Sequence, residues 1–172
     1  VAARRPLAAV RLRNDGDTGL PAGIVTAYDA AADGSVNFVG DAQLPLLPKG
    51  SFKFVTFALD AKTDIRRNDE GATESVLGKA VNGVLTVTTK SRRTIDYEVT
   101  APPDEDRDIV VEEPRVDGWR PAPDMKGVEE TPARYRFKIE APKGKTTKAS
   151  LSLEHTNSQT GTLTPLAPED IL

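Results

Sequence analysis

The chain has 172 residues, with 23 Lys and Arg against 26 Asp and Glu, so its formal net charge is −3. This length suits one medium domain or two small ones with a buried core. The mixed charge and a pI near 5.3 remove the electrostatic attraction on which nucleic-acid binding depends. No run of about 18 apolar residues offers a membrane span. The absence of cysteine excludes disulfides, thiolate metal sites and cysteine nucleophiles.

The first half of the chain predicts short strands separated by turn residues. Strands are expected at residues Leu7–Arg13, 24–29, 36–39 and Phe52–Leu59. In the last of these the apolar positions change face, which predicts a β-bulge near Phe54 or Val55. A hairpin is expected from residues 84–89 and 94–100, because both are rich in β-branched residues and the polar stretch 90–93 separates them.

The second half shows the clearest alternation of apolar and polar residues. Residues 134–140 and 148–154 each alternate at period two, and the Pro- and Gly-containing segment 141–145 lies between them, which predicts a second hairpin. A further strand is expected at residues 108–113. Residues 104–113 carry a net charge of −5 and residues 134–148 a net charge of +5. Opposite charges on neighbouring strands attract, so we expect the 108–113 strand beside the 134–148 hairpin.

Many short strands with Gly and Pro turns predict an all-β protein, an antiparallel immunoglobulin-like β-sandwich. The stiff acidic segment 101–106 indicates a boundary, which gives a β-sandwich subdomain at 1–101 and a second β subdomain, or completing strands, at 102–155. The alternative is one sandwich in which 101–106 is a loop. Residues 156–172 are expected to be a polar tail, with a helix starting at Pro168. Both ends are typical of a domain cut from a longer product.

Several segments together resemble an uncharacterised bacterial family. They are Leu12-Arg13-Asn14-Asp15, residues 20–28 (LPAGIVTAY), Pro48-Lys49-Gly50, residues 57–60 (FALD), Asp96-Tyr97-Glu98-Val99 and residues 109–114 (IVVEEP), followed by Gly118-Trp119. The chain resembles the domain-of-unknown-function family 4139, related to mucoidy-inhibitor-like envelope proteins. The resemblance implies a β-sandwich module of secreted or envelope-associated proteins, without an established activity or catalytic residues.

Few residues suggest chemistry. His155 is the only histidine, so a multi-histidine metal site is excluded and a surface or strand-end position is expected. Asp15 and Asp17 are weak calcium candidates, because the sequence around them fits a hairpin turn better than a calcium loop. Trp119 and Tyr135 could form a sugar-stacking platform, although a tryptophan that caps the core is the simpler interpretation. No motif indicates a cofactor.

A hydrolase would need two carboxylates at a defined separation, drawn from Glu112, Glu113, Glu130 and Glu154. Glu112 and Glu113 are adjacent in an expected strand and therefore point to opposite faces. The sequence favours a non-catalytic module acting in structure or protein interaction, with a protein or a cell-envelope component as its partner. The resemblance adds a periplasmic or extracytoplasmic location. Carbohydrate binding through Trp119 and carboxylate-based hydrolysis are the alternatives.

Overall fold

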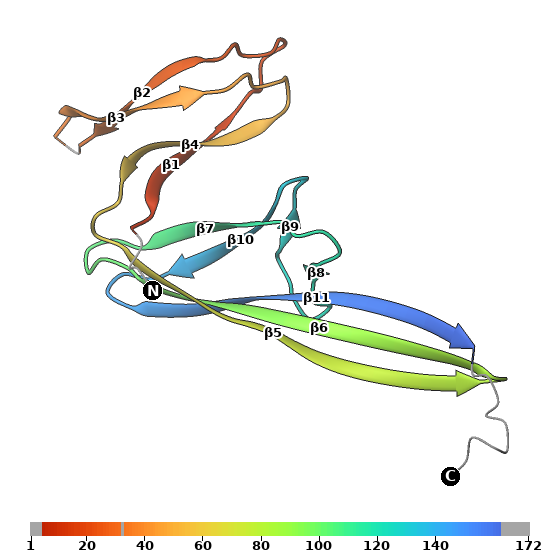
Figure 1. Ribbon diagram of the computed structural model, residues 1–172. Coiled ribbons are helices and arrows are strands. Elements are labelled where there is room, and N and C mark those ends of the chain that lie inside the picture. Colours follow the sequence, from red (N-terminus) through yellow and green to blue (C-terminus); the bar gives the residue numbers. More distant parts are fainter. Residues whose placement is uncertain (1–4, 32, 163–172) are drawn as a thin grey trace, which may run out of the picture. The chain divides into compact units, whose positions relative to one another are not determined.

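The computed structural model describes residues 5–31 and 33–162, and these residues form strands, turns and bends without a helix (Figure 1). The prediction of an all-β protein is therefore confirmed. No helix among the described residues is long and apolar enough to cross a membrane. The chain divides between residues 65 and 66 into two compact units, which are described separately.

The first unit contains two antiparallel strand pairs. β1 (Leu7–Arg13) pairs with β4 (Phe52–Leu59), and β2 (Gly23–Ala30) pairs with β3 (Val36–Leu44). Leu47, Val55 and Ala42 are buried between them. Asn14 is also buried, and its side-chain amide donates to the carbonyl oxygens of Thr18 (2.8 Å) and Leu47 (3.0 Å), which ties the loop after β1 to the core.

The expected bulge lies at a different residue. The ladder between β1 and β4 is regular from Phe52 to Thr56 and skips Phe57, so the bulge expected near Phe54 or Val55 lies two residues further along the same strand. The apolar side chains change face without a bulge because both faces of β4 are used. Phe52 and Phe54 form an edge-to-face pair at 5.9 Å with the guanidinium of Arg11 over Phe52, whereas Val55 is buried.

The second unit contains two sheets whose side chains meet in one core. One sheet has the order β7–β10–β9 and the other β5–β6–β11–β8. Their bounds are β5 (Asp64–Val81), β6 (Val84–Thr100), β7 (Arg107–Pro114), β8 (Arg120–Pro121), β9 (Glu129–Glu130), β10 (Arg134–Ala141) and β11 (Thr146–Thr162). Between the sheets, Tyr97 of β6 packs edge-to-face on Phe137 of β10 at 5.5 Å, and Ile95, Leu151 and Ile139 are almost completely buried.

Charge predicted one strand pairing. β7 and β10 are antiparallel neighbours, with Arg136 opposite Glu112. Arg136 bonds Glu112 at 2.6 Å, and Lys138 reaches Asp108 at 3.0 Å. The prediction that the acidic strand lies beside the basic one is confirmed for β10. The remaining part of the expected basic hairpin belongs to the other sheet.

Both expected hairpins are wrong. Residues 84–100 form the single strand β6, which pairs along its whole length with β11. The charged stretch 90–93 remains in the strand because partners neutralise it: Lys90 and Arg92 contact Glu154, and Arg93 contacts Asp69. β10 and β11 lie in different sheets, so the turn at 141–145 carries the chain across the core. Alternation identified the buried face of each strand but not its hydrogen-bonded neighbour.

Three further differences between expectation and structure concern where strands and subdomains begin and end. β5 was not predicted, because its residues beyond 69 are exposed and show no alternation. Residues 156–162, expected in a polar tail, are the end of β11, while the expected helix start at 168–172 lies outside the described residues. The segment 101–106, expected to divide two subdomains, connects β6 to β7 inside the second unit.

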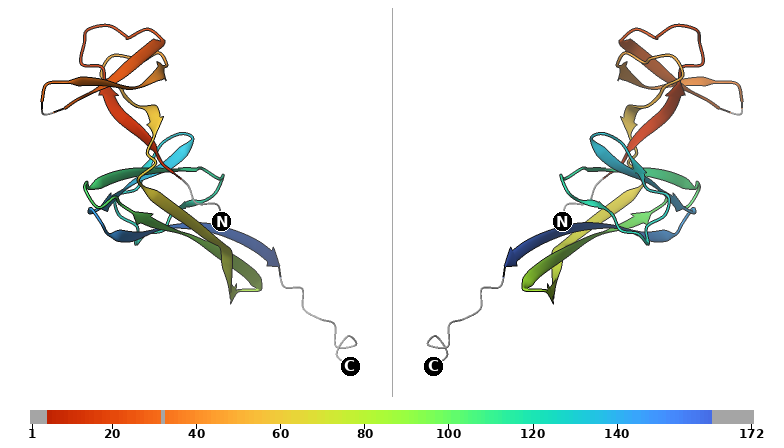
Figure 2. Two further views of the ribbon diagram at one scale, coloured as in Figure 1. Left: turned by 90° about the vertical axis from the view of Figure 1, so that its left-hand side faces the viewer. Right: turned by 90° about the vertical axis from the view of Figure 1, so that its right-hand side faces the viewer.

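β5, β6 and β11 continue together beyond the core as a three-stranded arm, here defined as residues 70–90 and 156–162 (Figures 1 and 2). At its tip Asn82 and Gly83, with φ of 50° and 74°, form the two-residue turn between β5 and β6. Every residue in the ranges 70–84 and 156–162 is exposed.

Candidate functional site

Trp119 lies in the connection between β7 and β8, and its position is fixed from two sides. Its N–H donates to the carbonyl oxygen of Val116 (3.1 Å), which closes a tight turn. Its half-buried indole stacks on the ring of His155 from β11, with ring centres 5.8 Å apart and planes at 29°. Gly118 has a φ of 79°, and a Cβ there would lie 2.7 Å from Cδ2 of His155. The turn therefore needs glycine so that His155 can approach Trp119.

Tyr135 supports this turn from inside the core. The side chain is completely buried, and its hydroxyl donates a hydrogen bond to the carbonyl oxygen of Trp119. The guanidinium of Arg115 lies over the ring, 5.6 Å from its centre. A fully buried ring has no face to offer to a sugar. The expectation of a platform formed jointly by Trp119 and Tyr135 is therefore corrected. Tyr135 lies in the core and holds the backbone of Trp119 through its hydroxyl.

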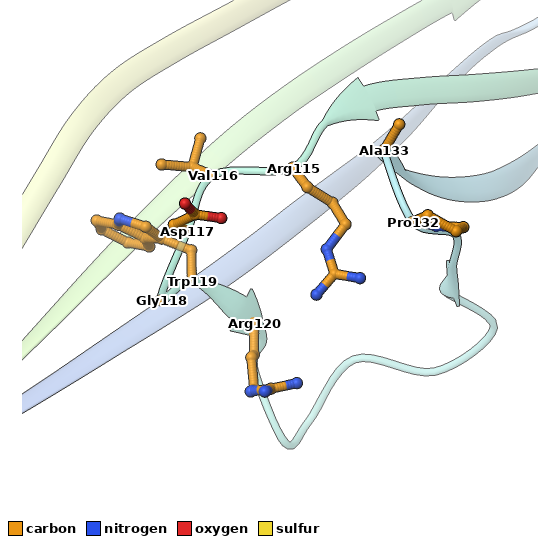
Figure 3. A pocket seen from close by; sticks show the side chains of 8 residues that line it. All are labelled: Arg115, Val116, Asp117, Gly118, Trp119, Arg120, Pro132 and Ala133. Atoms are coloured by element: carbon orange, nitrogen blue, oxygen red, sulfur yellow. The ribbon is translucent and has the colours of Figure 1, made fainter.

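A hollow of about 330 Å³ opens beside Trp119. Its lining residues are Arg115, Val116, Asp117, Gly118, Trp119, Arg120, Pro132 and Ala133. Figure 3 shows the side chains of Arg115 and Arg120 extending on one side of the turn, with the indole directed to the other. Glu130 is loosely placed against both guanidinium groups, at 3.6 Å from Arg115 and 4.0 Å from Arg120. The hollow therefore offers two cations with one weakly held counter-ion.

A second polar cluster joins the two sheets of the same unit. Arg67 of β5 donates to Glu113 of β7 at 2.7 Å and to Asp69 at 3.1 Å, while Arg93 of β6 binds Asp69 from the other side. Tyr97 of β6 donates its hydroxyl to Glu113. Two cations and two carboxylates satisfy one another here, so the cluster acts as a clamp between strands.

The clamp changes the ionisation of its members. The hydrogen bond from Arg93 lowers the pKa of Asp69 to about 2. Burial, followed by the hydrogen bond to the Glu113 carboxylate, raises the pKa of Tyr97. The hydrogen bond to Glu113 raises the pKa of Arg67. These shifts favour the ionised carboxylate of Asp69, the charged guanidinium of Arg67 and the neutral phenol of Tyr97.

The four glutamates considered for a hydrolase all lie within ion-pair distance of a cation. Glu112 binds Arg136, Glu113 binds Arg67, Glu154 binds Lys90, and Glu130 lies near Arg115.

Asp15 and Asp17 do not converge on a common point. Asp15 pairs with Arg13 at 2.8 Å, and Asp17 with Lys49 at 2.9 Å, on exposed side chains. The side-chain oxygen of Asn14 accepts from the N–H of Gly16 and organises the loop internally. Among the residues that the structure describes, no three His, Asp or Glu side chains gather as a metal site.

Comparisons of this chain with known proteins found no relative. No family model matches the chain, no curated protein matches it, and no solved structure matches it. The resemblance to the uncharacterised bacterial family therefore rests on the quoted sequence segments alone.

Sequence reasoning singled out Trp119 but missed its surroundings. His155 is 36 positions away in the chain, and only the pairing of β8 with β11 at Leu153 and Glu154 brings the two rings together. Arg115 and Arg120 carried no motif.

Proposed function

We propose that this chain is a non-catalytic module that acts in structure or protein interaction within a larger bacterial, envelope-associated protein. The periplasmic or extracytoplasmic location in this proposal is supported by the sequence resemblance. We further propose that the two sheets of the second unit form an immunoglobulin-like sandwich. Support for this comes from their shared core, in which Tyr97 and Phe137 meet.

The observation that carries the interaction proposal is the exposed arm. Strands gain most of their stability by burying a face against another layer. Among the described residues no second layer covers the arm. Its apolar side chains therefore remain open to solvent: Val76, Leu77 and Val81 are 67%, 70% and 50% exposed. Only two charged residues, Glu74 and Lys79, occur between positions 71 and 89. A surface this weakly charged is better suited to contact with a partner than to solvation.

The arm also has an open edge. β5 is the terminal strand of its sheet, so within the described residues no strand pairs with its outer side. The two-residue turn at Asn82 and Gly83 makes Val81 and Val84 a hydrogen-bonded pair, so the N–H groups of odd-numbered β5 residues near the tip face β6. By alternation the N–H of Val76 faces outward. An extended partner segment could add to this edge.

The test uses the intact gene product with a photo-reactive amino acid at position 76 or, as a control, at the exposed position 143. A partner captured only from position 76 is purified and titrated against the wild type and Val76→Pro. Proline removes the outward donor without breaking an internal bond, so we expect binding at least about tenfold weaker and an unchanged fold. Equal affinities for the two proteins would contradict a role of the β5 edge.

Leu77→Pro is the matched control for that variant. Its N–H faces β6, so the substitution removes a ladder hydrogen bond and should destabilise the arm itself. Urea unfolding and circular dichroism separate the two effects: Val76→Pro should behave as the wild type and Leu77→Pro should not.

A second candidate is carbohydrate binding at Trp119, favoured by the adjacent hollow with its two guanidinium groups. Arginine pairs well with carboxylates, so an acidic saccharide fits better than a neutral one. Because Trp119 is the only tryptophan, its fluorescence can be followed during titration with a disaccharide containing N-acetylmuramic acid, with chitobiose as the uncharged control. A flat response to both would remove this candidate.

A further inference from the structure

The β2–β3 hairpin of the first unit has an apolar outward face, formed by Ile24, Tyr28, Val36 and Phe38. These four side chains are 76%, 61%, 64% and 61% exposed. Tyr28 lies directly opposite Phe38 in the ladder, and the two rings pack edge-to-face at 6.1 Å. Val36 is opposite Ala30, two pairs further toward the turn and on the same face. Tyr28, Phe38 and Val36 therefore form one contiguous patch, and Ile24 lies beyond it, across the Thr26–Asp41 pair.

The core does not account for this patch. Ala42 and Gly40 are buried on the opposite face of the hairpin, while Val25 and Ala27 are half-buried there. The outward face carries the larger side chains although the inward face forms the core. Contiguous exposed apolar side chains with polar neighbours mark interaction surfaces in soluble proteins.

The charges around the patch are all negative. Asp41 lies on the outward face opposite Thr26, and Asp29 and Asp33 lie near the closed end of the hairpin. The sequence holds no Lys, Arg or His between Arg13 and Lys49. Both of these flanking cations pair with other acids, Asp15 and Asp17. Among the described residues no cation pairs with Asp29, Asp33 or Asp41, so the hairpin keeps a charge of −3. Asp41 shares the face of the patch, whereas Asp29, opposite Asn37, lies on the other face.

We propose that this outward face of β2–β3 binds a basic amphipathic segment of a partner protein, in which apolar side chains alternate with Lys or Arg. The apolar residues of the segment cover Tyr28 and Phe38, and its cations lie against Asp41 on the same face and Asp33 at the closed end of the hairpin. The inference rests on the proposed role in protein interaction and adds to it a surface and the chemistry of the partner. Complementary charge on this rim would mainly accelerate association and select the partner.

The test is a titration of the full ¹⁵N-labelled chain, 18.5 kDa, with a capped peptide of about nine residues that alternates Lys with Val and Tyr. A second peptide carries Glu in place of each Lys. We expect amide shift changes confined to residues 23–44 with the Lys peptide, weakening several-fold as salt is raised from low to physiological strength. The Glu peptide should bind at least about tenfold more weakly. Equal binding of both peptides, or shifts outside the hairpin, would overturn the proposal.

Two variants with matched controls locate the contact. Phe38→Ser should weaken binding of the Lys peptide about tenfold, whereas Leu46→Ser, at the similarly exposed Leu46 (63%), should not. Asp41→Lys should weaken it about fivefold, whereas Asp17→Lys makes the same change of charge away from the patch and should have little effect. Unchanged binding by both Phe38→Ser and Asp41→Lys would refute the assigned surface.

Failure of this proposal can be distinguished from failure of the proposed function. Val76→Pro alters the arm and leaves β2–β3 intact, so it should bind the Lys peptide as the wild type does. A second copy of the chain is the competing occupant. Sedimentation that reveals a dimer dissociated by Phe38→Ser would assign the face to self-association and overturn the proposal.

Discussion

Removing the carboxylate of Asp69 should change both the stability of the second unit and its dependence on pH. Asp69 accepts hydrogen bonds from Arg93 and Arg67 and from the N–H of Gly71. Its side chain is 19% exposed, so solvent screens the ion pairs only in part. Asp69→Asn keeps the shape of the side chain and removes the charge that both guanidinium groups contact.

The lowered pKa of Asp69 sets the expected loss in the free energy of unfolding. A shift from 3.8 to about 2 corresponds to about 2.4 kcal/mol at 1.36 kcal/mol per pH unit, and we reduce this to about 1.5 kcal/mol for partial exposure. The folded pKa lies below the unfolded pKa. The stabilisation is therefore present in full above about pH 4 to 5 and is lost as the pH falls through about 2.

The assay is urea unfolding between pH 7 and pH 2.5, followed by the fluorescence of Trp119, which lies in the same unit. Asp69→Asn should be about 1.5 kcal/mol less stable at pH 7, and the difference should shrink toward zero at the acid end. Glu98→Gln is the matched control, because it removes a carboxylate whose partner, Lys148, is 78% exposed, and no measurable loss is expected. A constant difference between wild type and Asp69→Asn at every pH would refute the reasoning.

Three further predictions concern packing and turns. Tyr135→Phe leaves the carbonyl oxygen of Trp119 without its buried donor and should cost about 1–3 kcal/mol with altered Trp119 emission; unchanged stability would mean that the hydroxyl is dispensable. Gly118→Ala forces a Cβ against His155 and should lower the melting temperature, and His155→Ala should restore part of the loss; no rescue would place the strain elsewhere. Gly83→Ala requires a left-handed alanine in the tip turn and should cost about 1 kcal/mol, measured as faster amide exchange at Val81 and Val84 while the core amides stay protected.

Two strands have the bounds that the sequence predicts. β1 and β4 begin and end as expected because turn residues flank them, residues 14–17 after β1 and residues 45–50 before β4. Opposite charge also located β7 beside β10. The long range of Coulomb attraction made this one tertiary contact visible from residue types alone.

The rest depends on information that alternation does not contain. β5 lacks a buried face beyond residue 69, so it has no period to detect, although the Asn82-Gly83 pair between two apolar residues is a hairpin signal that could have located its end. Alternation in β10 and β11 does not distinguish neighbours in one sheet from strands facing each other across a core. The pairing of Trp119 with His155 follows from the sheet order, which no local motif encodes.

The unbroken ladder between β6 and β11 has a consequence for the arm. No residue of the arm is buried, so its own side chains hardly distinguish one alignment of the strands from the next. Leu151 and Leu153, at the other end of the same ladder, would turn out of the core if the strands slid by a single residue. The interior thus acts as the anchor that sets the alignment at the tip, and deleting one residue from β11 between these leucines and the tip would misalign the arm without touching the core.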